Sequence, residues 1–372
     1  MTRSIVISIN TAWNIVNFRA SLIKALIEHG YDVVVVAPPD DYADRIPLLG
    51  CRYIPIAMDN GGTNPLRDLK LLFDFYRVFS EVRPFCFLGY TVKPNVYGSF
   101  AARSLGIPTI NNVAGLGTAF IKESWITLVA KMLYRMAFSG AYKVFFQNND
   151  DLEYFVRSRL VKPGIALRIP GSGIDTSRFA PKEMDKEGGR FRFILIGRLL
   201  WDKGIREYVE AARLIKERNP NVEFQLLGFL GVDNRTAVSR SEVERWEAEG
   251  LIAYLGSTDN VIPFIERADC VVLPSYREGA PRALLEAASM AKPIITTDAV
   301  GCRDVVDDGI SGFMAKAGDA SDLAEKMEKM LLLPGDQRVS MGRNGRNKMV
   351  REFDESIVIN NYLTALDALA QR

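Results

Sequence analysis

Apolar residues recur along the chain in two patterns that alternate from one end to the other. Short apolar runs, typical of strands buried on both faces, are separated by longer stretches whose apolar positions follow a helical period. In the first part of the chain the short runs are 5–9, 33–37, 85–90, 109–112 and 143–147, and the helical stretches are 18–29, 66–82, 96–105, 125–138 and 151–159. Such repeated strand–helix units predict a parallel sheet covered by helices.

The pattern is interrupted once and then restarts. Residues 169–175 and 181–190 are rich in glycine, proline and charge, which indicates a linker. Beyond it, strand-like runs occur at 191–196, 223–227, 251–255, 270–273, 293–297 and 312–315, with helical stretches at 205–218, 261–267, 283–290, 320–332 and 355–370. A chain of 372 residues is also too long for one typical core. We therefore expect two α/β domains, 1–170 and 171–354, with a ligand crevice between them.

The bulk composition narrows the class of protein. A hydrophobic content of 48% and a charged content of 25% are ordinary for a soluble globular enzyme, and a net charge of +2 argues against a dedicated nucleic-acid binder. The four cysteines have no short spacing, which fits reduced thiols of a cytosolic protein better than a disulfide frame or a zinc site. The apolar run at the N-terminus is shorter than the core of a signal peptide, and no stretch reaches the roughly 18 to 20 apolar residues of a spanning helix. We therefore expect a cytoplasmic protein.

Two carboxylates, Glu278 and Glu286, flank the start of a predicted helix in the second half. The run 269–275 is typical of a buried strand that ends at a proline, and a helix is predicted after Pro281. Both carboxylates could face a crevice at the carboxyl end of that strand, where open α/β sheets bind ligands and a helix N-terminus can bind phosphate. Taken alone, the pair could also be the acid and base of a glycoside hydrolase.

Two cations follow another predicted strand and change the interpretation of this pair. Arg198 and Lys203 come directly after the strand 191–196, beside Gly197 and Gly204. Fixed cations at a strand end can neutralise a diphosphate leaving group. The simpler alternative is a pair of surface charges, with Gly204 helping a turn.

The first strand–helix loop, residues 10–19, contains no glycine. A dinucleotide-binding turn needs G-x-G-x-x-G for close approach to the pyrophosphate, so a nicotinamide dehydrogenase is disfavoured. Asn14 and Asn17 in this loop either cap a helix or contact a donor phosphate or an acceptor.

These residues together resemble family 4 retaining nucleotide-sugar glycosyltransferases. The resemblance covers roughly residues 170 to 350 and rests on the order and spacing of Gly197-Arg198, Lys203-Gly204, Pro274-Ser275, Glu278-Gly279-Ala280-Pro281, Leu285-Glu286-Ala287, Lys292-Pro293, Gly301-Cys302-Arg303-Asp304, Asp308-Gly309 and Gly312-Phe313. It implies a GT-B fold, with two Rossmann-like parallel-sheet domains facing a central cleft. The second domain would hold the donor and the first the acceptor, and the last helix, within 355–372, would pack back on the first domain.

A narrower resemblance comes from 89–98, 113–117 and 227–234, which are similar to bacterial enzymes that extend undecaprenyl-diphosphate-linked sugars, such as N-acetylgalactosaminyl- and galactosyltransferases. It implies transfer of a hexose or N-acetylhexosamine from a UDP-sugar to a lipid-diphosphate-linked saccharide in surface polysaccharide or glycan assembly. Two alternatives stay open. One is a nucleotide-sugar epimerase of the same architecture, and the other is a non-catalytic two-domain sugar-binding protein, which would have little use for Arg198 and Lys203 beside Glu278.

The resemblance also implies roles for individual residues on the donor side. Arg198 and Lys203 would bind the diphosphate, Glu286 the ribose hydroxyls, and Glu278 the transferred sugar or its developing positive charge. The donor would further contact Gly197, the backbone of Gly279 and Ala280, and the segment 256–259 that includes Ser257. The acceptor hydroxyl would attack from the face that the diphosphate leaves, and the leaving phosphate would take its proton. We expect no metal and no cofactor, because the cations and a helix N-terminus do that electrostatic work.

The acceptor side departs from the family pattern at one position. Many members carry a histidine near the transferred sugar, whereas the one histidine of this chain, His29, lies at a predicted helix end, where it would interact with the helix dipole. Either Asn112 or the backbone around Gly115 takes that role, or the sugar binds differently. Lys93 is a candidate for an acceptor phosphate, and Asn14 for the acceptor or the donor.

Residues 121–138 mix apolar and basic side chains with two interfacial aromatics. An amphipathic helix of this kind can lie on an anionic bilayer, which would place the enzyme peripherally on the inner face of the plasma membrane. The alternative is a helix packed on its own domain with a solvated basic side. The choice between uridine and guanosine donors, the transferred sugar and the acceptor glycan stay open at this point.

Overall fold

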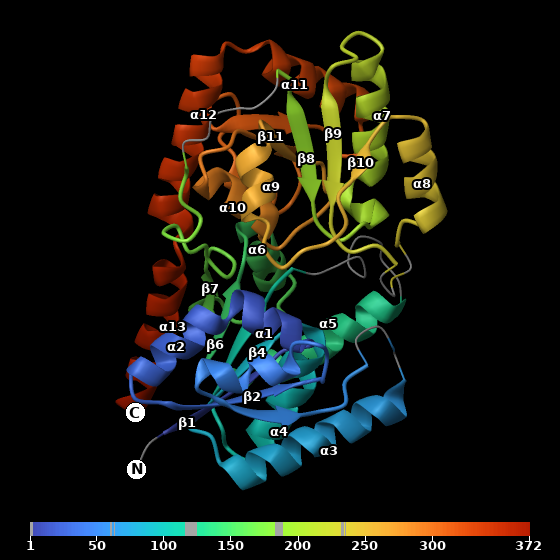
Figure 1. Cartoon of the computed structure of the whole chain (residues 1–372). Coiled ribbons are helices and arrows are strands. Elements are labelled where there is room, and N and C mark those ends of the chain that lie inside the picture. Colours follow the sequence, from blue (N-terminus) through green and yellow to red (C-terminus); the bar gives the residue numbers. More distant parts are fainter. Residues whose placement is uncertain are drawn as a thin grey trace. The chain divides into compact units, whose positions relative to one another are not determined.

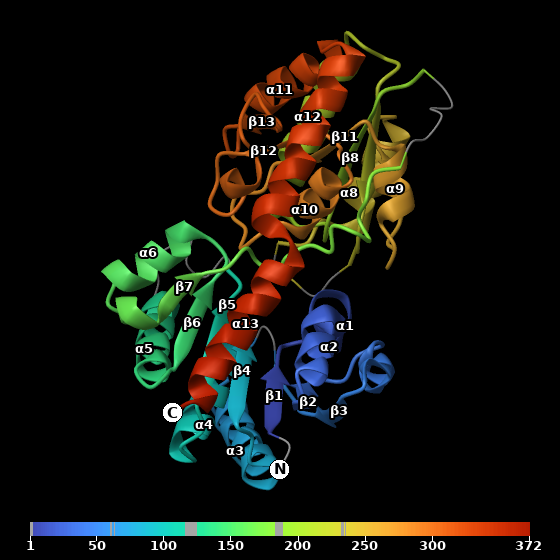
Figure 2. The same ribbon diagram turned by 90° about the vertical axis from the view of Figure 1, so that its left-hand side faces the viewer.

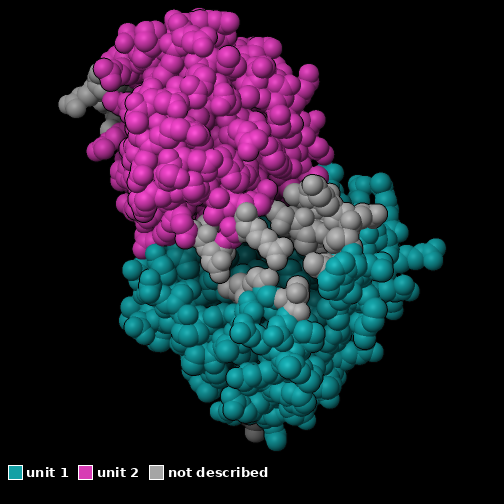
Figure 3. All heavy atoms as spheres, turned by 90° about the vertical axis from the view of Figure 1, so that its right-hand side faces the viewer, with its two compact units in different colours: residues 1–172, 355–372 teal, residues 173–354 magenta. Residues whose placement is uncertain are grey.

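The computed structural model describes residues 3–59, 62, 64–115, 125–182, 189–231, 234 and 236–372. The chain divides into two compact units, coloured separately in Figure 3: unit 1 is Met1–Ser172 with Glu355–Arg372, and unit 2 is Gly173–Asp354. The border expected from the sequence lies two residues away, between residues 170 and 171. Parts of the expected motifs, residues 116–117, 121–124 and 233, lie outside the described residues.

Unit 1 is built on a seven-stranded parallel sheet. Its strands are β1 (Ser4–Ser8), β2 (Asp32–Ala37), β3 (Arg52–Pro55), β4 (Cys86–Tyr90), β5 (Thr109–Val113), β6 (Lys143–Phe146) and β7 (Ala166–Arg168), in the spatial order β3-β2-β1-β4-β5-β6-β7. Most strands are apolar on both faces, as expected of a sheet covered on both sides by helices.

Helices cover the two faces of this sheet. They are α1 (Ala12–Phe18), α2 (Ala20–Glu28), α3 (Pro65–Val82), the π-helical turn η3 (Pro94–Gly98), α4 (Ser99–Ser104), α5 (Trp125–Phe138), α6 (Asn149–Arg157) and α13 (Glu355–Ala370). Alternate residues of β1 point to opposite cores: Ile5 and Ile7 pack with α2 and α13, and Val6 packs with α3 and α4. Figure 2 shows α13 running along this sheet, as the resemblance implied.

Unit 2 repeats the arrangement with a six-stranded parallel sheet (Figure 1). Its strands are β8 (Arg192–Ile196), β9 (Glu223–Leu227), β10 (Ala253–Tyr254), β11 (Cys270–Leu273), β12 (Ile294–Thr297) and β13 (Gly312–Ala315), in the order β10-β9-β8-β11-β12-β13. Its helices are η6 (Trp201–Lys203), α7 (Ile205–Lys216), α8 (Arg240–Ala248), α9 (Ile262–Arg267), α10 (Arg282–Ser289), η7 (Arg303–Val305), α11 (Ala320–Leu332), α12 (Gly335–Lys348) and η8 (Met349–Phe353). The predicted pair of Rossmann-like parallel sheets is confirmed.

Several local expectations were wrong, each for a physical reason. The expected loop 10–19 is mostly helix α1, because the Thr11 side chain accepts a hydrogen bond from the Asn14 backbone N and caps the helix. The strands β3 and β7 and the helix α12 were not predicted. α12 is polar and contains Gly342, where a Cβ would lie 1.9 Å from the carbonyl oxygen of Ala291, so close packing requires a residue with low helix propensity.

Each sheet has one point where its strand order reverses. In unit 1 this switch point lies between β1 and β4, and in unit 2 it lies between β8 and β11. Because successive crossovers leave these two neighbouring strands on opposite sides, a crevice forms outside their carboxyl ends, where open α/β sheets bind ligands. The topology therefore marks one candidate site in each unit.

Candidate functional site

The switch point of unit 2 collects the cations and the glutamate that the sequence indicated. Gly197 and Arg198 follow β8, and Glu278 follows β11. Lys203 ends the short helix η6, and its Nζ donates a hydrogen bond to Glu278 Oε1 in a close ion pair. Side-chain exposure is 20% for Lys203 and 11% for Glu278, so the pair is largely shielded from solvent. The structure thus brings two predicted site residues, 75 positions apart, into direct contact.

Glycines allow the backbone to approach closely around this ion pair. Gly204 has φ +74°, and a Cβ there would lie 2.0 Å from the carbonyl oxygen of Pro274, at the end of β11. Gly301 has φ +77°, and its Cβ would lie 2.3 Å from the carbonyl oxygen of Glu278. Only glycine satisfies both the left-handed conformation and the close contact. The loops after β8 and β12 are therefore fitted against the turn that carries Glu278.

Hydrogen bonds hold that turn in place. The carbonyl oxygen of Asp202 accepts two hydrogen bonds, from the backbone N of Tyr276 at 3.0 Å and from the hydroxyl of Ser275 at 3.1 Å. The backbone N of Glu278 donates to the carbonyl oxygen of Val300 at 2.9 Å. Asp202 was not among the predicted site residues. It contributes its backbone carbonyl oxygen, which every residue type has, so the sequence could not indicate it. The carboxylate of Glu278 is therefore attached to a rigid turn.

A second contact supports the same turn. The hydroxyl of Tyr276 donates to Glu207 Oε1 at 2.7 Å, and Glu207, in the first turn of α7, is buried. Burial, followed by the hydrogen bond to this carboxylate, raises the pKa of Tyr276 to about 12, so the hydroxyl stays a donor at neutral pH. The sequence did not indicate this pair.

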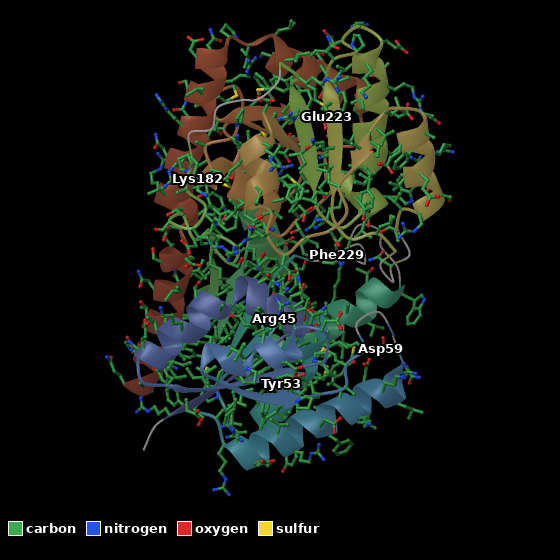
Figure 4. All side chains as sticks on the ribbon, viewed as in Figure 1. Arg45, Tyr53, Asp59, Lys182, Glu223 and Phe229 are labelled. Atoms are coloured by element: carbon green, nitrogen blue, oxygen red, sulfur yellow. The ribbon has the colours of Figure 1, made fainter. Side chains whose placement is uncertain are left out.

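Arg198 differs from Lys203 in having no protein partner. It is exposed, and its side chain forms no hydrogen bond or ion pair with any residue that the structure describes. The next residue, Leu199, donates its backbone N to the carbonyl oxygen of Phe229 at 3.0 Å. Figure 4 labels Glu223 at the start of β9 and Phe229 beyond its other end, which marks the carboxyl edge of this sheet. An unpaired guanidinium beside an ion-paired ammonium at this edge is suited to an anionic ligand.

Glu286 lies inside α10 and has its own cation. It is buried, and its Oε1 accepts a hydrogen bond from Arg282 Nε at 3.0 Å, while Arg282 Nη1 donates to the carbonyl oxygen of Gly173 at 2.9 Å. Burial raises the pKa of Glu286, and Arg282 opposes that shift. Glu278 lies ahead of α10, as expected of a residue in the turn before the helix. The i, i+4 spacing of Arg282 and Glu286 could have revealed their pairing from the sequence.

The remaining donor-side candidates lie on nearby turns. Gly279 and Ala280 are half-buried in the turn before α10. Ser257 is exposed after β10, next to Gly256, whose carbonyl oxygen accepts a hydrogen bond from the backbone N of Gly228 at 2.8 Å. The structure therefore places Ser257 on the carboxyl side of the sheet but gives its side chain no partner that would identify its role.

On the acceptor side, the side chains of Lys93 and Asn112 are already engaged within unit 1. Lys93 Nζ lies 2.6 Å from Asp68 Oδ1, and the hydroxyl of Tyr97 donates to Asp68 Oδ2 at 2.9 Å. A contact between Lys93 and an acceptor phosphate would have to break this ion pair. Asn112 is buried and donates to the hydroxyl of Tyr362 at 3.2 Å, so its side chain joins β5 to α13.

The other first-domain candidates lie on α1, after β5 and at the end of α2. Asn14 lies in the first turn of α1, capped by Thr11, and Asn17 Nδ2 donates to the carbonyl oxygen of Trp13 at 2.9 Å. Gly115 follows β5 with φ +103°. His29 is the residue at the end of α2, as expected, and its Nε2 lies 3.0 Å from Asp367 Oδ1 on α13. It therefore also links two helices of unit 1.

Among the residues that the structure describes, no three histidine, cysteine, aspartate or glutamate side chains are grouped so as to hold a metal ion. None of the helices formed by these residues has the length and apolarity needed to cross a membrane.

Comparison with known proteins covers both halves of the chain. Residues 15–170 match the family model of the glycosyl transferase 4-like domain, and residues 177–348 match that of glycosyl transferases group 1. The chain is 29% identical over 370 residues to the N,N'-diacetylbacillosaminyl-diphospho-undecaprenol alpha-1,3-N-acetylgalactosaminyltransferase of Campylobacter jejuni, covering 95% of this chain and 96% of that protein. It is 26% identical over 337 residues to the UDP-Gal:alpha-D-GlcNAc-diphosphoundecaprenol alpha-1,3-galactosyltransferase of Escherichia coli, covering 85% and 83% of the two chains.

Solved structures agree on the fold. A glycosyltransferase from Rickettsia africae superimposes with a TM-score of 0.82 at 15% identity, covering 100% of this chain and 99% of that one. Anabaena Alr3699/HepE in complex with UDP and glucose superimposes with a TM-score of 0.79 at 16% identity, covering 99% of both chains.

Proposed function

Because the chain belongs to the glycosyltransferases in which a glycosyl transferase 4-like domain precedes a group 1 domain, we propose that it moves a hexose or N-acetylhexosamine from a UDP-sugar to a lipid-diphosphate-linked saccharide. The reaction would retain the anomeric configuration and contribute to surface polysaccharide or glycan assembly. The relatives from C. jejuni and E. coli carry out reactions of this class, and they give no support to an epimerase or a non-catalytic sugar-binding protein.

The observation that carries the proposal is the grouping of Arg198, Lys203 and Glu278 at the switch point of unit 2. As the bond between the anomeric carbon and the diphosphate oxygen breaks, negative charge grows on the diphosphate and positive charge on the sugar. Arg198 and Lys203 would stabilise the first, and the carboxylate of Glu278 the second. The acceptor hydroxyl would attack from the face that the diphosphate leaves and give its proton to the departing phosphate oxygen.

A rigid arrangement of these charges matters for the rate. Lys203 and Glu278 form an ion pair, and glycine contacts hold both of their loops. Charges that are oriented before the reaction need no reorganisation when the bond breaks, which is how fixed dipoles and ions lower a barrier. Glu286, buried on α10, would accept hydrogen bonds from the ribose hydroxyls.

The donor class is tested first. We expect UDP to raise the melting temperature of the protein more than GDP at equal concentration, because bound ligand stabilises the folded state in proportion to its affinity. A preference for GDP would mean that the donor is a GDP-sugar, while the proposed reaction would still be the transfer of a sugar to the acceptor. Transfer of sugar from a radiolabelled UDP-sugar to a synthetic polyprenyl-diphosphate saccharide tests the reaction itself, and interconversion of UDP-sugars without an acceptor would favour the epimerase.

A lipid-linked acceptor calls for contact with a membrane, and α5 is suited to it. Five of its apolar side chains are between 46% and 72% exposed: Trp125, Leu128, Val129, Met132 and Met136. The helix also carries Lys131 and Arg135 and no acidic residue. We propose that this face lies on an anionic bilayer at the inner face of the plasma membrane, with the enzyme otherwise in the cytoplasm.

Helix α3 adds a second apolar stripe that the sequence interpretation missed. Leu66, Leu69, Phe73 and Tyr76 recur at helical spacing and are between 45% and 78% exposed. Both α3 and α5 contact the turn η3, so the two stripes flank one part of unit 1. Exposed apolar stripes on neighbouring helices make this part of unit 1 a candidate interaction site.

Liposome sedimentation tests the membrane contact. The wild type should sediment with vesicles containing anionic lipid, and the double change Leu128→Ser and Phe73→Ser should abolish this. Leu332→Ser, at an equally exposed apolar residue in unit 2, is the matched control and should bind like the wild type. Failure of the wild type to bind anionic vesicles at low salt would remove the proposal.

A further inference from the structure

The switch point of unit 1, between β1 and β4, has no assigned ligand. Ser8 ends β1 and lies opposite Gly89 on β4, and Tyr90 ends β4 and lies opposite Asn112 on β5. The same rule that selects the donor site in unit 2 selects this edge in unit 1. None of the residues singled out in the sequence supplies an available charge here, because Lys93 is ion-paired to Asp68.

Arg19 provides that charge. It interrupts the helical run between α1 and α2, with φ −128° and ψ −2°, and its side chain is buried, with 5% of the residue exposed. The guanidinium lies 4.4 Å from the centre of the Tyr90 ring, and Nη1 donates to the carbonyl oxygen of Phe18 at 2.9 Å. Its Nε is buried without a hydrogen-bond partner, and Arg19 forms no ion pair with any carboxylate in the described part of the chain.

A buried guanidinium without a counter-ion is unusual. Charged side chains are almost never fully buried unless they are paired, because the lost hydration has to be replaced. The ring of Tyr90 offers a cation–π contact, which replaces only part of it. The fold therefore keeps a destabilising group at the place where α/β sheets bind ligands, as expected if the missing partner is a ligand.

A small cavity lies beside this group. Arg19, Tyr90, Asn112 and Glu355 line a space of about 10 Å³, which is large enough for one oxygen atom. The Tyr90 hydroxyl is also buried; it faces the hydroxyl of Tyr362 and donates no hydrogen bond to any residue that the structure describes. Burial raises the pKa of Tyr90, so its hydroxyl keeps its proton at neutral pH and acts as a donor. A guanidinium with an unpaired Nε and a hydroxyl with an available proton thus share one oxygen-sized space.

We propose that Arg19 and the Tyr90 hydroxyl bind one anionic oxygen of a phosphate ester or diphosphate. The inference rests on the proposed function, in which the acceptor carries a diphosphate and the first domain receives it. It assigns to Arg19 the role that the sequence interpretation gave to Lys93. Glu355, the first residue of α13, lines the same cavity and would repel the anion, so its charge should weaken binding.

The test is a calorimetric titration of the full chain saturated with UDP, which occupies the donor site. Inorganic pyrophosphate and geranyl diphosphate are the probes. Wild type should bind both saturably, Arg19→Gln about tenfold or more weakly, and Tyr90→Phe several-fold more weakly, as expected for lost hydrogen bonds to a charged group. Glu355→Gln should bind more tightly, and Arg52→Gln, at an exposed arginine on β3, should match the wild type. Tighter binding of geranyl diphosphate indicates a lipid-linked anion, and tighter pyrophosphate binding a free one.

Two outcomes overturn the proposal. If the UDP-saturated wild type binds neither probe, or if Arg19→Gln binds as tightly as the wild type, the cavity holds water only. Should Arg19→Gln fail to fold, Tyr90→Phe and Glu355→Gln decide the question, because each changes a single atom of the cavity wall. A wild type that binds UDP but neither probe refutes this inference alone, whereas a wild type that does not bind UDP refutes the UDP-sugar donor of the proposed function.

Discussion

Replacing Gly204 by alanine tests the link between close backbone packing and activity. Gly204 joins η6 to α7 with φ +74°, and a Cβ there would lie 2.0 Å from the carbonyl oxygen of Pro274, where ordinary contact needs 3.4 Å or more. The loop that carries Lys203 and the turn that carries Glu278 would have to separate by about 1.4 Å. A misplacement of about 1 Å at reacting groups can lower the rate about 100-fold.

The stability cost has two parts. The left-handed conformation costs a residue with a Cβ about 1–2 kcal/mol, and overpacking against the backbone costs about 1–3 kcal/mol more. At about 2–4 °C per kcal/mol for a unit of this size, Gly204→Ala should melt several degrees below the wild type. Calorimetric melting and kcat/KM for sugar transfer measure the two effects on the same sample.

Gly250→Ala is the matched control. Gly250 has φ +68°, and no atom lies within 4 Å of the position of its Cβ, so it shares the conformational strain of Gly204 but lacks the clash. It should lose only about 1–2 kcal/mol of stability and keep its activity. The reasoning is refuted if the two variants have the same melting temperature and the same kcat/KM, because the contact with Pro274 would then have no consequence.

The other predictions concern charges. Arg198→Ala and Lys203→Ala should each lower kcat by about 10²–10³-fold, as removal of a charge-stabilising donor does elsewhere, and wild-type turnover in either variant would rule out its assigned role. The rate of sugar transfer should be unchanged by excess EDTA, because Arg198 and Lys203 neutralise the diphosphate without a metal ion. Loss of turnover in EDTA would contradict this. Because burial raises the pKa of Glu286, the folded protein binds that proton more tightly than the unfolded chain, so this group's contribution to stability declines as pH rises through the usual carboxylate range. Urea unfolding of Glu286→Gln at about pH 4 and about pH 8 should therefore show a smaller decline than the wild type, and equal declines would contradict the shift.

Much of the fold followed from local pattern. The runs at 223–227, 270–273 and 312–315 and the helices at 125–138, 320–332 and 355–370 were predicted with the bounds that the structure has. Buried strands of a parallel sheet are continuously apolar and surface helices have a period near 3.6, so both leave a strong signal in the sequence. Short or half-exposed strands such as β3 and β7 leave little signal, and the polar helix α12 leaves none, because its position depends on glycine contacts with another segment.

The candidate site likewise has features that the sequence shows and features that it does not show. Glycines and charges directly after strands are visible in the sequence, and the order of the motifs was enough to indicate the family and the donor-side residues. Which charges are already neutralised was not visible. Asp68 lies 25 positions before the Lys93 that it pairs with, and Asp367 lies 338 positions after His29. Arg19 was not among the candidates, because nothing in its local sequence indicates that its side chain is buried without an ion-pair partner.

The sequence by itself therefore determined the alternating elements, the two parallel sheets and the residues at the carboxyl ends of their strands, because these depend on local periodicity and on chain order. The tertiary structure decided the strand order that creates a switch point in each unit. It also decided the ion pair between Lys203 and Glu278 and the burial of Arg19 without a counter-ion. Those features depend on which distant residues share a low-dielectric space, and hydrophobic burial brings such residues together without leaving a trace in local spacing.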